Sequence, residues 1–394
     1  MIAPRLIEWQ RRHGRHQLPW QNTRDAYRIW LSEVMLQQTQ VGTVVPYYLR
    51  FVERFPDVAS LAAADDEEVL ALWSGLGYYS RARNLHRCAR EVVTSHGGAF
   101  PDDPARLAAL PGIGRSTAAA IAVFAFGRRA AILDGNVRRV LCRHAGVRGY
   151  PGERAVEDTL WRIAENELPL AGVEPYTQGL MDLGAMLCTR TRPSCTACPI
   201  GADCSAHRDG TVAELPTPRP RRSVPLRRCE MFVVRCGDEV LLERRPPSGI
   251  WGGLWSLPQS SLRDAGAGEA HAAARTAVTD RLAACADVGG DGSDDFAQRQ
   301  AVAEIERRFG LQVTPARPLA AFDHAFTHFR LRVQPLACEV LAATAAAQSP
   351  GHAWLPLAEC ASAALPRPVK SLLAALPLRS PDAAEDTGTA ATGV

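Results

Sequence analysis

The sequence predicts two domains: an all-α N-terminal domain followed by an α+β C-terminal domain. From Leu6 to about Cys204, segments of 10–16 residues carry apolar residues at helical spacing, with Gly, Pro and Asp between them. After a stretch rich in Pro and Arg, apolar runs with turn residues between them indicate strands. The 394 residues suit two domains of ordinary size, which we place at 1–204 and 229–380.

The helix expected over residues 27–41, "YRIWLSEVMLQQTQV", carries a candidate general acid. Glu33 is its only acidic residue, lies among apolar neighbours and would share a helix face with Gln37 and Gln40. A carboxyl group in apolar surroundings has a raised pKa and can donate a proton near neutral pH. The alternative is a surface glutamate on a polar stripe.

The hairpin "LPGIGRSTAAAI" follows, with a glycine turn between two helices. Gly112 and Gly114 allow a sharp turn and a close approach to another surface. The next helix begins at Arg115 and Ser116, where free backbone N–H groups can bind a phosphate. A DNA backbone is the expected ligand, and a plain packing corner between helices is the alternative.

A second carboxylate, Asp134, follows "AAIL", which resembles a strand, and precedes Gly135 and Asn136 at the start of a helix. A helix cap is the alternative role for Asp134. Two carboxylates suit the cleavage of a glycosidic bond, because one protonates the leaving group and the other stabilises the positive charge left on the sugar.

Four clustered cysteines indicate a metal centre. They are Cys188, Cys195, Cys198 and Cys204, in the pattern C-x6-C-x2-C-x5-C over residues 188–204. Four thiolates at this spacing can close around one centre, and zinc and an iron–sulfur cluster fit the spacing equally. Disulfides are excluded because we expect a cytoplasmic chain, which has no apolar signal core and no apolar segment long enough for a membrane.

Charge and composition divide the chain in the same place. Residues 1–228 hold 30 Arg against 23 acidic residues, whereas the remainder has an excess of acids. The basic half suggests a polyanionic partner, and an ordinary arginine-rich surface is the alternative. Residues 205–228 are expected to form a linker, residues 263–300 a flexible insertion and residues 381–394 a disordered tail.

The second domain is expected to begin with a β-hairpin. "CEMFVVRCGDEVLLERR" has turn residues at Gly237 and Asp238 between two apolar runs, and "FTHFRLRVQPLACEV" is a further strand-rich segment.

Several segments in one order resemble the adenine DNA glycosylase (MutY) family of the helix-hairpin-helix, or endonuclease III, superfamily. They are "WLSEVMLQQTQV", "LWSGLGYYSRARNL", "LPGIGRSTA", "ILDGNVRRV", "MDLGAMLCTR" and the four-cysteine spacing. The resemblance covers about residues 6–258 and resumes near 322–336. It implies a helix-hairpin-helix glycosylase fold, one [4Fe–4S] cluster per chain on the four cysteines, and a Nudix-like second domain.

The resemblance also implies a substrate and a reaction. The family removes adenine mispaired with 8-oxoguanine or guanine from double-stranded DNA and must extrude the adenine to reach it. By motif match Glu33 is the catalytic acid, Asp134 stabilises the charged sugar and Asn136 supports the site. Trp20 and Gln21 would line the adenine pocket. We expect a monomeric enzyme of base excision repair.

Three residues match the family positions that wedge into the duplex around the opened pair: Gln38, Leu76 and Tyr78. The alternative for Tyr78 is a core aromatic after a glycine turn.

In the second domain, Phe326, Thr327 and His328 match the segment that reads 8-oxoguanine, with threonine where the family often has serine. The segment "AVAEIERRFGL" lacks the paired glutamates of a Nudix hydrolase, so pyrophosphate hydrolysis is not expected.

Two rival functions remain to be weighed. Endonuclease III shares the hairpin and the cluster, but it lacks a Nudix-like domain and has a lysine where this chain has Ser116. A hydroxyl cannot form the imine of a lyase, and the only lysine here is Lys370, so we expect a monofunctional glycosylase without efficient lyase activity. A non-catalytic iron–sulfur protein that binds DNA or senses redox state is the second rival, and the presence of both carboxylates argues against it.

Overall fold

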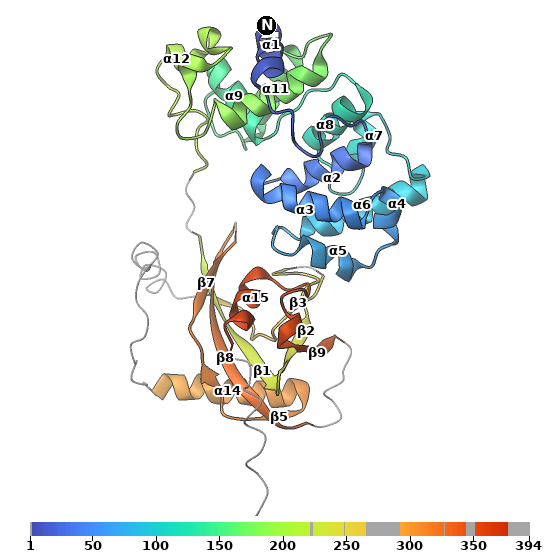
Figure 1. Ribbon diagram of the computed structural model, residues 1–394. Helices are drawn as coiled ribbons and strands as arrows, with labels where there is room; N and C mark the ends of the chain where they lie inside the picture. Colours follow the sequence, from blue (N-terminus) through green and yellow to red (C-terminus); the bar gives the residue numbers. More distant parts are fainter. Residues whose placement is uncertain are drawn as a thin grey trace, which may run out of the picture. The chain divides into compact units, whose positions relative to one another are not determined.

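The structure is a computed structural model that describes residues 2–220, 224–247, 249–264, 292–326, 328–343 and 351–376. The chain divides into two compact units, Met1–Arg221 and Arg222–Val394. Figure 1 shows the first as helices coloured blue to green and the second as a sheet with helices coloured yellow to red. Thr327, the expected tail over 381–394 and most of the expected insertion over 263–300 lie outside the described residues.

The first unit is helical, as predicted, and its helices form two groups (Figure 1). One group contains α1 (Ala3–His13), α9 (Gly135–Ala145), α10 (Arg154–Asn166), α11 (Val173–Met186) and α12 (Ser205–Arg208). The other contains α2 (Ala26–Leu36), α3 (Val41–Arg54), α4 (Val58–Ala63), α5 (Asp66–Trp73), α6 (Ser80–His96), α7 (Pro104–Ala108) and α8 (Arg115–Phe126). Helix α8 packs on both α2 and α11 and so joins the groups.

Buried apolar side chains hold the first group together. Leu6 of α1, Leu141 of α9, Leu160 of α10 and Leu183 of α11 are all fully buried in one core. Removing this apolar surface from water is the main stabilising contribution to such a group. The core fixes α9 and α11, which carry residues of the candidate site.

The helix predicted over residues 27–41 is shorter than expected. Asp25 caps α2 by accepting the backbone N–H of Tyr27 at 2.9 Å, but α2 ends at Leu36. Gln38 then adopts a left-handed backbone with φ of 57° before α3 begins at Val41. Glu33, Gln37 and Gln40 therefore do not share a helix face, and that expectation is wrong.

The predicted hairpin is present between α7 and α8. Gly112 has a φ of 76°, and a Cβ there would lie 2.7 Å from the Cβ of Asn84, so the turn requires glycine. The "AAIL" segment after α8 is not a strand but an unpaired stretch that leads into α9. Its backbone is held by a side chain instead, because the N–H of Leu133 donates to Ser116 Oγ at 3.0 Å.

The second unit is an α+β domain, as predicted. β1 (Leu226–Cys236) and β2 (Glu239–Arg244) form the expected antiparallel hairpin at Gly237, and β1 pairs in parallel with β8 (Arg330–Ala343). The sheet order is β3-β2-β1-β8-β5. The other strands are β3 (Trp255–Ser256), β4 (Arg263–Asp264), β5 (Leu311–Val313), β6 (Arg317–Pro318), β7 (Phe322–Ala325) and β9 (His352–Pro356).

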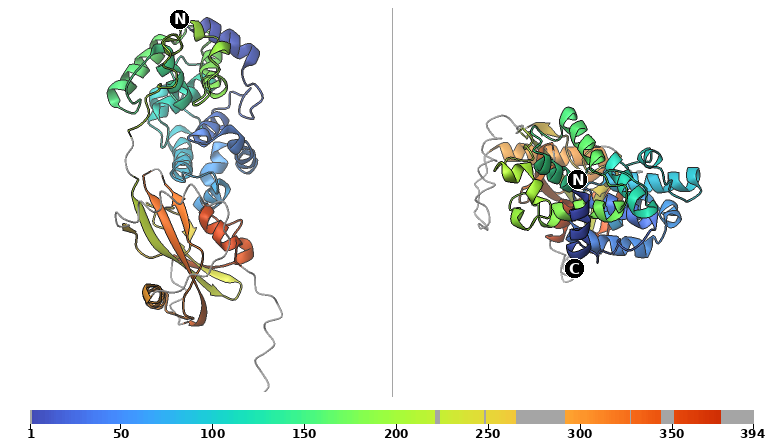
Figure 2. Two further views of the ribbon diagram at one scale, coloured as in Figure 1. Left: turned by 90° about the vertical axis from the view of Figure 1, so that its left-hand side faces the viewer. Right: turned by 90° about the horizontal axis from the view of Figure 1, so that it is seen from above.

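Two longer helices accompany this sheet, α14 (Gly292–Phe309) and α15 (Arg367–Ala374) (Figure 2). Ile305 and Phe309 of α14 are buried in one core with Phe232 and Leu241 of the sheet. Helix α14 begins inside the range 263–300 that the sequence assigned to a flexible insertion, so the described residues 292–300 are helical.

The predicted linker over residues 205–228 is also shorter than expected. Ala206 and Leu215 are buried, and Arg143 Nε donates to the carbonyl of Leu215 at 2.7 Å. Strand β1 already begins at Leu226. The Pro- and Arg-rich composition gave no sign of these two buried residues, Ala206 and Leu215. They pack the first part of this segment on the first unit.

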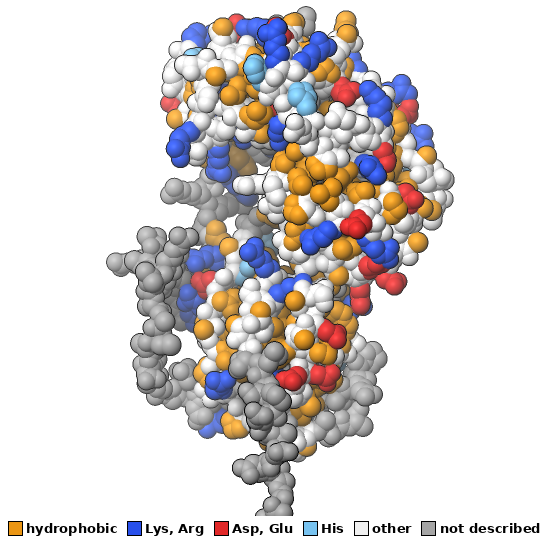
Figure 3. Space-filling model, viewed as in Figure 1, with side chains coloured by type: hydrophobic (Ala, Val, Ile, Leu, Met, Phe, Trp, Pro, Cys, Tyr) orange, Lys and Arg blue, Asp and Glu red, His pale blue; other side chains and the backbone are white. Residues whose placement is uncertain are grey.

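Charged and apolar side chains are mixed on the surface of the first unit (Figure 3). On the face of the first unit that Figure 3 shows, arginine side chains are scattered among acidic and apolar ones. None of the described helices is both long and apolar enough to cross a membrane.

Candidate active site

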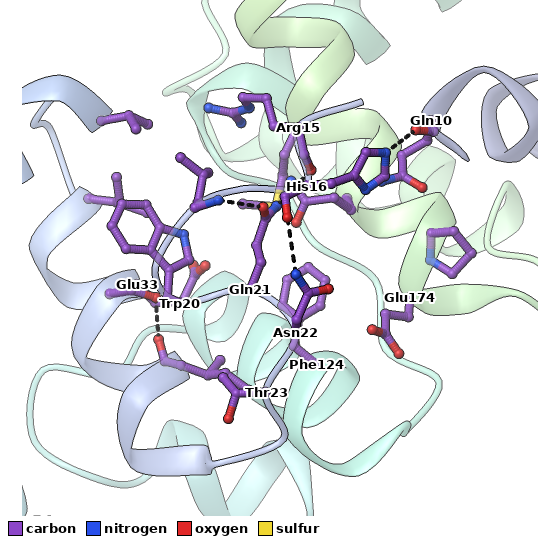
Figure 4. Close-up of a pocket in the computed structure, with 18 residues that line it drawn as sticks. Gln10, Arg15, His16, Trp20, Gln21, Asn22, Thr23, Glu33, Phe124 and Glu174 are labelled. Carbon is purple, nitrogen blue, oxygen red and sulfur yellow. Dashed lines mark hydrogen bonds between the residues drawn. The ribbon is translucent and has the colours of Figure 1, made fainter. Parts of the chain in front are cut away.

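A cavity of about 210 Å³ lies in the first unit between the 14–25 loop, α2 and α11. Figure 4 shows Trp20, Gln21 and Glu33, three of the predicted site residues, in its lining. The family resemblance placed all three at one site, and the structure brings them together because the loop and α2 meet after folding. Other side chains of the lining include Gln10, Arg15, His16, Asn22, Thr23, Ser32, Phe124, Glu174, Gln178 and Met181.

Glu33 has the electrostatic properties of an acid catalyst. Burial, and to a smaller extent the negative charge of Asp134, raises the pKa of Glu33 from 4.5 to about 8. Burial removes the carboxyl group from water, which disfavours its charged form. Glu33 is therefore mostly protonated at neutral pH and can donate a proton to a group in the cavity.

Asp134 has the helix-capping role that the sequence left open as its alternative. Its Oδ1 accepts the backbone N–H of Val137 at 2.7 Å and so caps α9. Burial raises the pKa of Asp134, although hydrogen bonds from the N–H groups of Val137 and Asn136 act in the opposite direction. Both of these hydrogen bonds come from the first turn of α9, so the Asp134 carboxyl group is fixed at the N-terminus of that helix.

Asn136 lies at the closest approach of α9 and α11. A Cβ at Gly184 of α11 would lie 3.0 Å from the Cα of Asn136, so only glycine lets the helices come this near. The Asn136 side chain accepts Arg139 Nη2 at 2.9 Å. Asn136 thus supports the start of α9, where Asp134 is held.

An ion pair that the sequence did not indicate anchors the cavity loop. Asp182 of α11 has a fully buried side chain, accepts Arg15 Nε at 2.6 Å and accepts the Arg15 backbone N–H at 2.9 Å. Gln178 Nε2 donates to the same carboxylate at 2.9 Å. Asp182 lies within "MDLGAMLCTR", one of the segments that carry the family resemblance. The sequence did not show that Asp182 binds Arg15.

Gln21 and Trp20 shape the loop from inside. The Gln21 amide accepts the N–H of Leu18 at 3.0 Å and donates to the carbonyl of Arg15 at 2.9 Å. Its polar atoms therefore hold the loop in this structure. The Trp20 side chain is buried, with its ring edge-on to Tyr48 at 5.3 Å between centroids.

The hairpin leaves room for a ligand at Gly114 but engages Arg115 elsewhere. A Cβ at Gly114, the N-cap of α8, would meet nothing within 4 Å. The Arg115 guanidinium pairs with Glu165 and lies 3.8 Å over the ring of Trp161. In this conformation an acid and an aromatic ring contact the Arg115 guanidinium, which stays about half exposed, and its contact with a DNA backbone remains a prediction.

Two of the three predicted wedge residues project from the surface. Tyr78 is 45% exposed with a φ of 50°, and Gln38 is exposed on its own left-handed turn. Leu76 is 5% exposed and packs inside, so it is not presented to a duplex here. The exposure of Tyr78 excludes the core aromatic that the sequence left open.

The four predicted metal ligands line one small apolar pocket: Cys188, Cys195, Cys198 and Cys204. Arg143 lies beside them, with Nη1 3.4 Å from Cys188 Sγ. Within the described part of the chain, no group of three or more His, Cys, Asp or Glu side chains is arranged to hold a single metal ion. The cysteines converge, but not around one ion.

Phe326 and His328, the described residues of the segment predicted to read 8-oxoguanine, lie between β7 and β8. The N–H of Phe326 donates to the carbonyl of Phe329 at 2.9 Å, and their rings stack at 4.6 Å between centroids. His328 is exposed at the tip. The ring of Trp251 lies next to this segment, 6.0 Å from the ring of Phe326 between centroids.

Comparison with known proteins identifies the family. Residues 31–166 match the HhH-GPD superfamily of base excision DNA repair proteins, and residues 230–375 match the NUDIX domain. Adenine DNA glycosylase of Mus musculus is 32% identical, covering 93% of this chain and 76% of the mouse protein. That of Buchnera aphidicola subsp. Baizongia pistaciae is 36% identical over 64% of this chain and 72% of its own. The chain belongs to the adenine DNA glycosylase family.

The family membership confirms the fold expected from the sequence motifs, a helix-hairpin-helix glycosylase domain followed by a Nudix-like domain. This chain is a DNA glycosylase. A solved thermostable thymine-DNA glycosylase is 30% identical over 52% of this chain and 95% of its own, with a TM-score of 0.48. The NUDIX match is what the adenine DNA glycosylase resemblance implied and what the endonuclease III alternative did not.

Proposed function

We propose that this glycosylase hydrolyses the N-glycosidic bond of adenine mispaired with 8-oxoguanine or guanine in double-stranded DNA, acting as a monomer. The observation that carries the proposal is Glu33, a carboxyl group with a pKa raised to about 8 in the wall of a cavity that a flipped base can enter. Extrusion brings the base to the cavity, because the bond to be cut is not accessible in the stack.

The reaction needs one proton donor and one charge stabiliser. Glu33 donates its proton to a ring nitrogen of adenine, and the C–N bond breaks with its electron pair leaving on the base. Asp134 faces the positive charge that remains on the sugar. Water then adds to the sugar and returns a proton to the Glu33 carboxylate, which gives free adenine and an abasic site.

The residues that would contact DNA are assigned from their exposure and from the family motifs. Gln38 and Tyr78 are exposed and would wedge into the duplex, while the open N-terminus of α8 at Gly112, Gly114 and Ser116 would bind its backbone. In the second unit, Phe326, Thr327 and His328 would read the 8-oxoguanine. Polar contacts to the lesion then provide the discrimination.

The cysteine pocket fits a [4Fe–4S] cluster. Its lining is apolar and includes all four cysteines, and Arg143 supplies a positive charge beside Cys188. A [4Fe–4S] cluster is bound by four cysteine thiolates, which is the ligand set that this pocket brings together. When bound, such a cluster supplies folding energy to the loop that holds it.

Strand scission after alkali treatment tests the main proposal. Duplexes with adenine opposite 8-oxoguanine or guanine should be cut after alkali, and a duplex with adenine opposite thymine should resist. Equal cutting of all three, or none of any, would overturn the proposed specificity.

The absence of lyase activity has a separate test at Ser116. Lys370 is the only lysine in the chain, it belongs to the second unit, and Ser116 Oγ is engaged by the N–H of Leu133. Borohydride added during turnover should therefore trap little covalent product. Ser116→Lys should gain trapping, whereas Ser116→Ala, which loses only the hydrogen bond, should not. Efficient trapping by the unaltered protein would contradict the assignment.

A further inference from the structure

One buried arginine connects the two turns that carry the exposed wedge residues. Arg81 lies in the first turn of α6 and is only 8% exposed. One of these turns contains Gln38 and follows α2. The other contains Tyr78 and precedes α6. They are about 40 residues apart in the sequence, so the connection exists only in the folded chain.

The first turn is held at the end of α2. Arg81 Nη1 donates to the carbonyls of Val34 at 2.9 Å and Met35 at 2.8 Å. These oxygens are among the last carbonyls of α2, which lack partners within the helix because α2 ends at Leu36. Arg81 Nη2 also donates to Thr39 Oγ1 at 3.1 Å. Gln38 is thus enclosed between two points that Arg81 holds.

The second turn is held by the same guanidinium. Nη2 lies 3.4 Å from the carbonyl of Leu76 and 3.3 Å from that of Gly77, in hydrogen-bond contact with both. The guanidinium carbon also lies 5.4 Å from the ring centroid of Tyr78. Burial lowers the pKa of Arg81 to about 10, so the side chain is still charged at neutral pH.

Both turns have backbone strain that needs such support. Gln38 has a φ of 57° and Tyr78 a φ of 50°, although neither is glycine. Left-handed backbone is unfavourable for these residues and persists only when surrounding contacts require it. The strain lies at the two exposed side chains whose positions would matter to a duplex.

We propose that Arg81 is a positioning residue that sets both wedge turns together and ties them to the helix that carries Glu33. This inference rests on the proposed function, because it assigns the turns to base-pair opening. Val34, whose carbonyl Arg81 binds, directly follows Glu33. A displacement of either turn would therefore shift the backbone next to the acid. The planar fork of arginine can reach several carbonyls at once, which a lysine ammonium cannot do in the same geometry.

The test compares substrates that differ in the cost of opening the pair. Single-turnover adenine release is measured for Arg81→Gln and Arg81→Lys on a duplex with adenine opposite 8-oxoguanine and on one with adenine opposite an abasic analogue. We expect Arg81→Gln to lose about tenfold or more on the paired duplex and clearly less on the unpaired one. Arg81→Lys should lie between this variant and the unaltered protein.

Arg90→Gln is the matched control. Arg90 lies on the same helix and also contacts carbonyls, those of Ala62 and Ala64 at 3.4 Å each, but neither wedge turn. Its release rates should match those of the unaltered protein on both duplexes. Thermal melting of every variant reports folding, and Arg81→Lys provides the comparison if Arg81→Gln folds poorly.

A second readout does not depend on excision. With 2-aminopurine in place of the target adenine, fluorescence on binding reports unstacking, and Arg81→Gln should show a smaller increase than Arg90→Gln. Equal losses of rate on both duplexes together with unchanged fluorescence would overturn the role of Arg81. Unaltered protein that unstacks the base but releases no adenine would instead contradict the proposed function.

Discussion

At the scale of single residues, the position of the proton on Glu33 decides the chemistry. Glu33→Gln keeps the size of the side chain but cannot donate the same proton. We expect adenine release to fall by about 100-fold or more while mispair binding persists. Single-turnover release and a binding titration measure the two effects.

Glu157→Gln is the control for this change, because Glu157 lies outside the cavity and pairs with Arg138 at 2.9 Å. Its release rate should be close to that of the unaltered protein. Near-normal release by Glu33→Gln would remove Glu33 from the mechanism.

The raised pKa of Glu33 also predicts a pH dependence with a defined sign. The protonated form is the active one, so adenine release should decrease as the pH rises through about 8. Stability should follow the same direction, because a raised pKa in the folded state stabilises below the ordinary value of 4.5 and the contribution is lost as the pH rises toward about 8. Glu33→Gln should lack this part of the melting profile, and an identical profile would contradict the assignment.

At the scale of elements, the cysteine loop is expected to depend on its cofactor. Purified protein should be brown with about four irons per chain, as one [4Fe–4S] cluster requires. Cys198→Ser should lower both the iron content and the folded yield, because ligand binding and folding are coupled. Iron analysis and circular dichroism measure these effects.

Cys236→Ser is the control for the cysteine loop, since Cys236 is exposed in the second unit. It should keep the iron content of the unaltered protein. Stoichiometric zinc in protein purified without oxygen would overturn the cluster assignment.

The end of α2 shows why an element boundary can escape sequence patterns. Apolar spacing favours a helix through residue 41, because each residue from Leu36 to Val41 is compatible with one. The helix ends at Leu36 in a structure where Arg81, 46 residues beyond Met35, binds its last carbonyls. A pattern of near neighbours contains no information about such a distant donor.

At the scale of the whole molecule, the two units are expected to divide catalysis and lesion reading. A protein that ends at Arg221 retains the core of the first unit and the cavity, so it should release adenine weakly but lose preference for 8-oxoguanine over guanine. Competition between the two duplexes measures the preference. His328→Ala in the full chain should reproduce part of the loss, because exposed His328 is assigned to the lesion.

Unchanged preference in the shortened protein would assign lesion reading to the first unit. A preference that is lost in the shortened protein but intact in His328→Ala would instead assign it to other residues of the second unit.

By itself the sequence determined the order of the two domains, the residue types at the site and the family, because these depend on composition and on motifs within short segments. Tertiary structure decided which of those residues act together. It brought Trp20 and Glu33 to one cavity, raised the pKa of Glu33 by burial, and turned Arg115 toward Glu165. It also supplied Asp182 and Arg81 as anchors. The physical reason is that burial and hydrogen-bond partners come from segments far apart in the chain, such as Arg15 and Asp182, 167 residues apart.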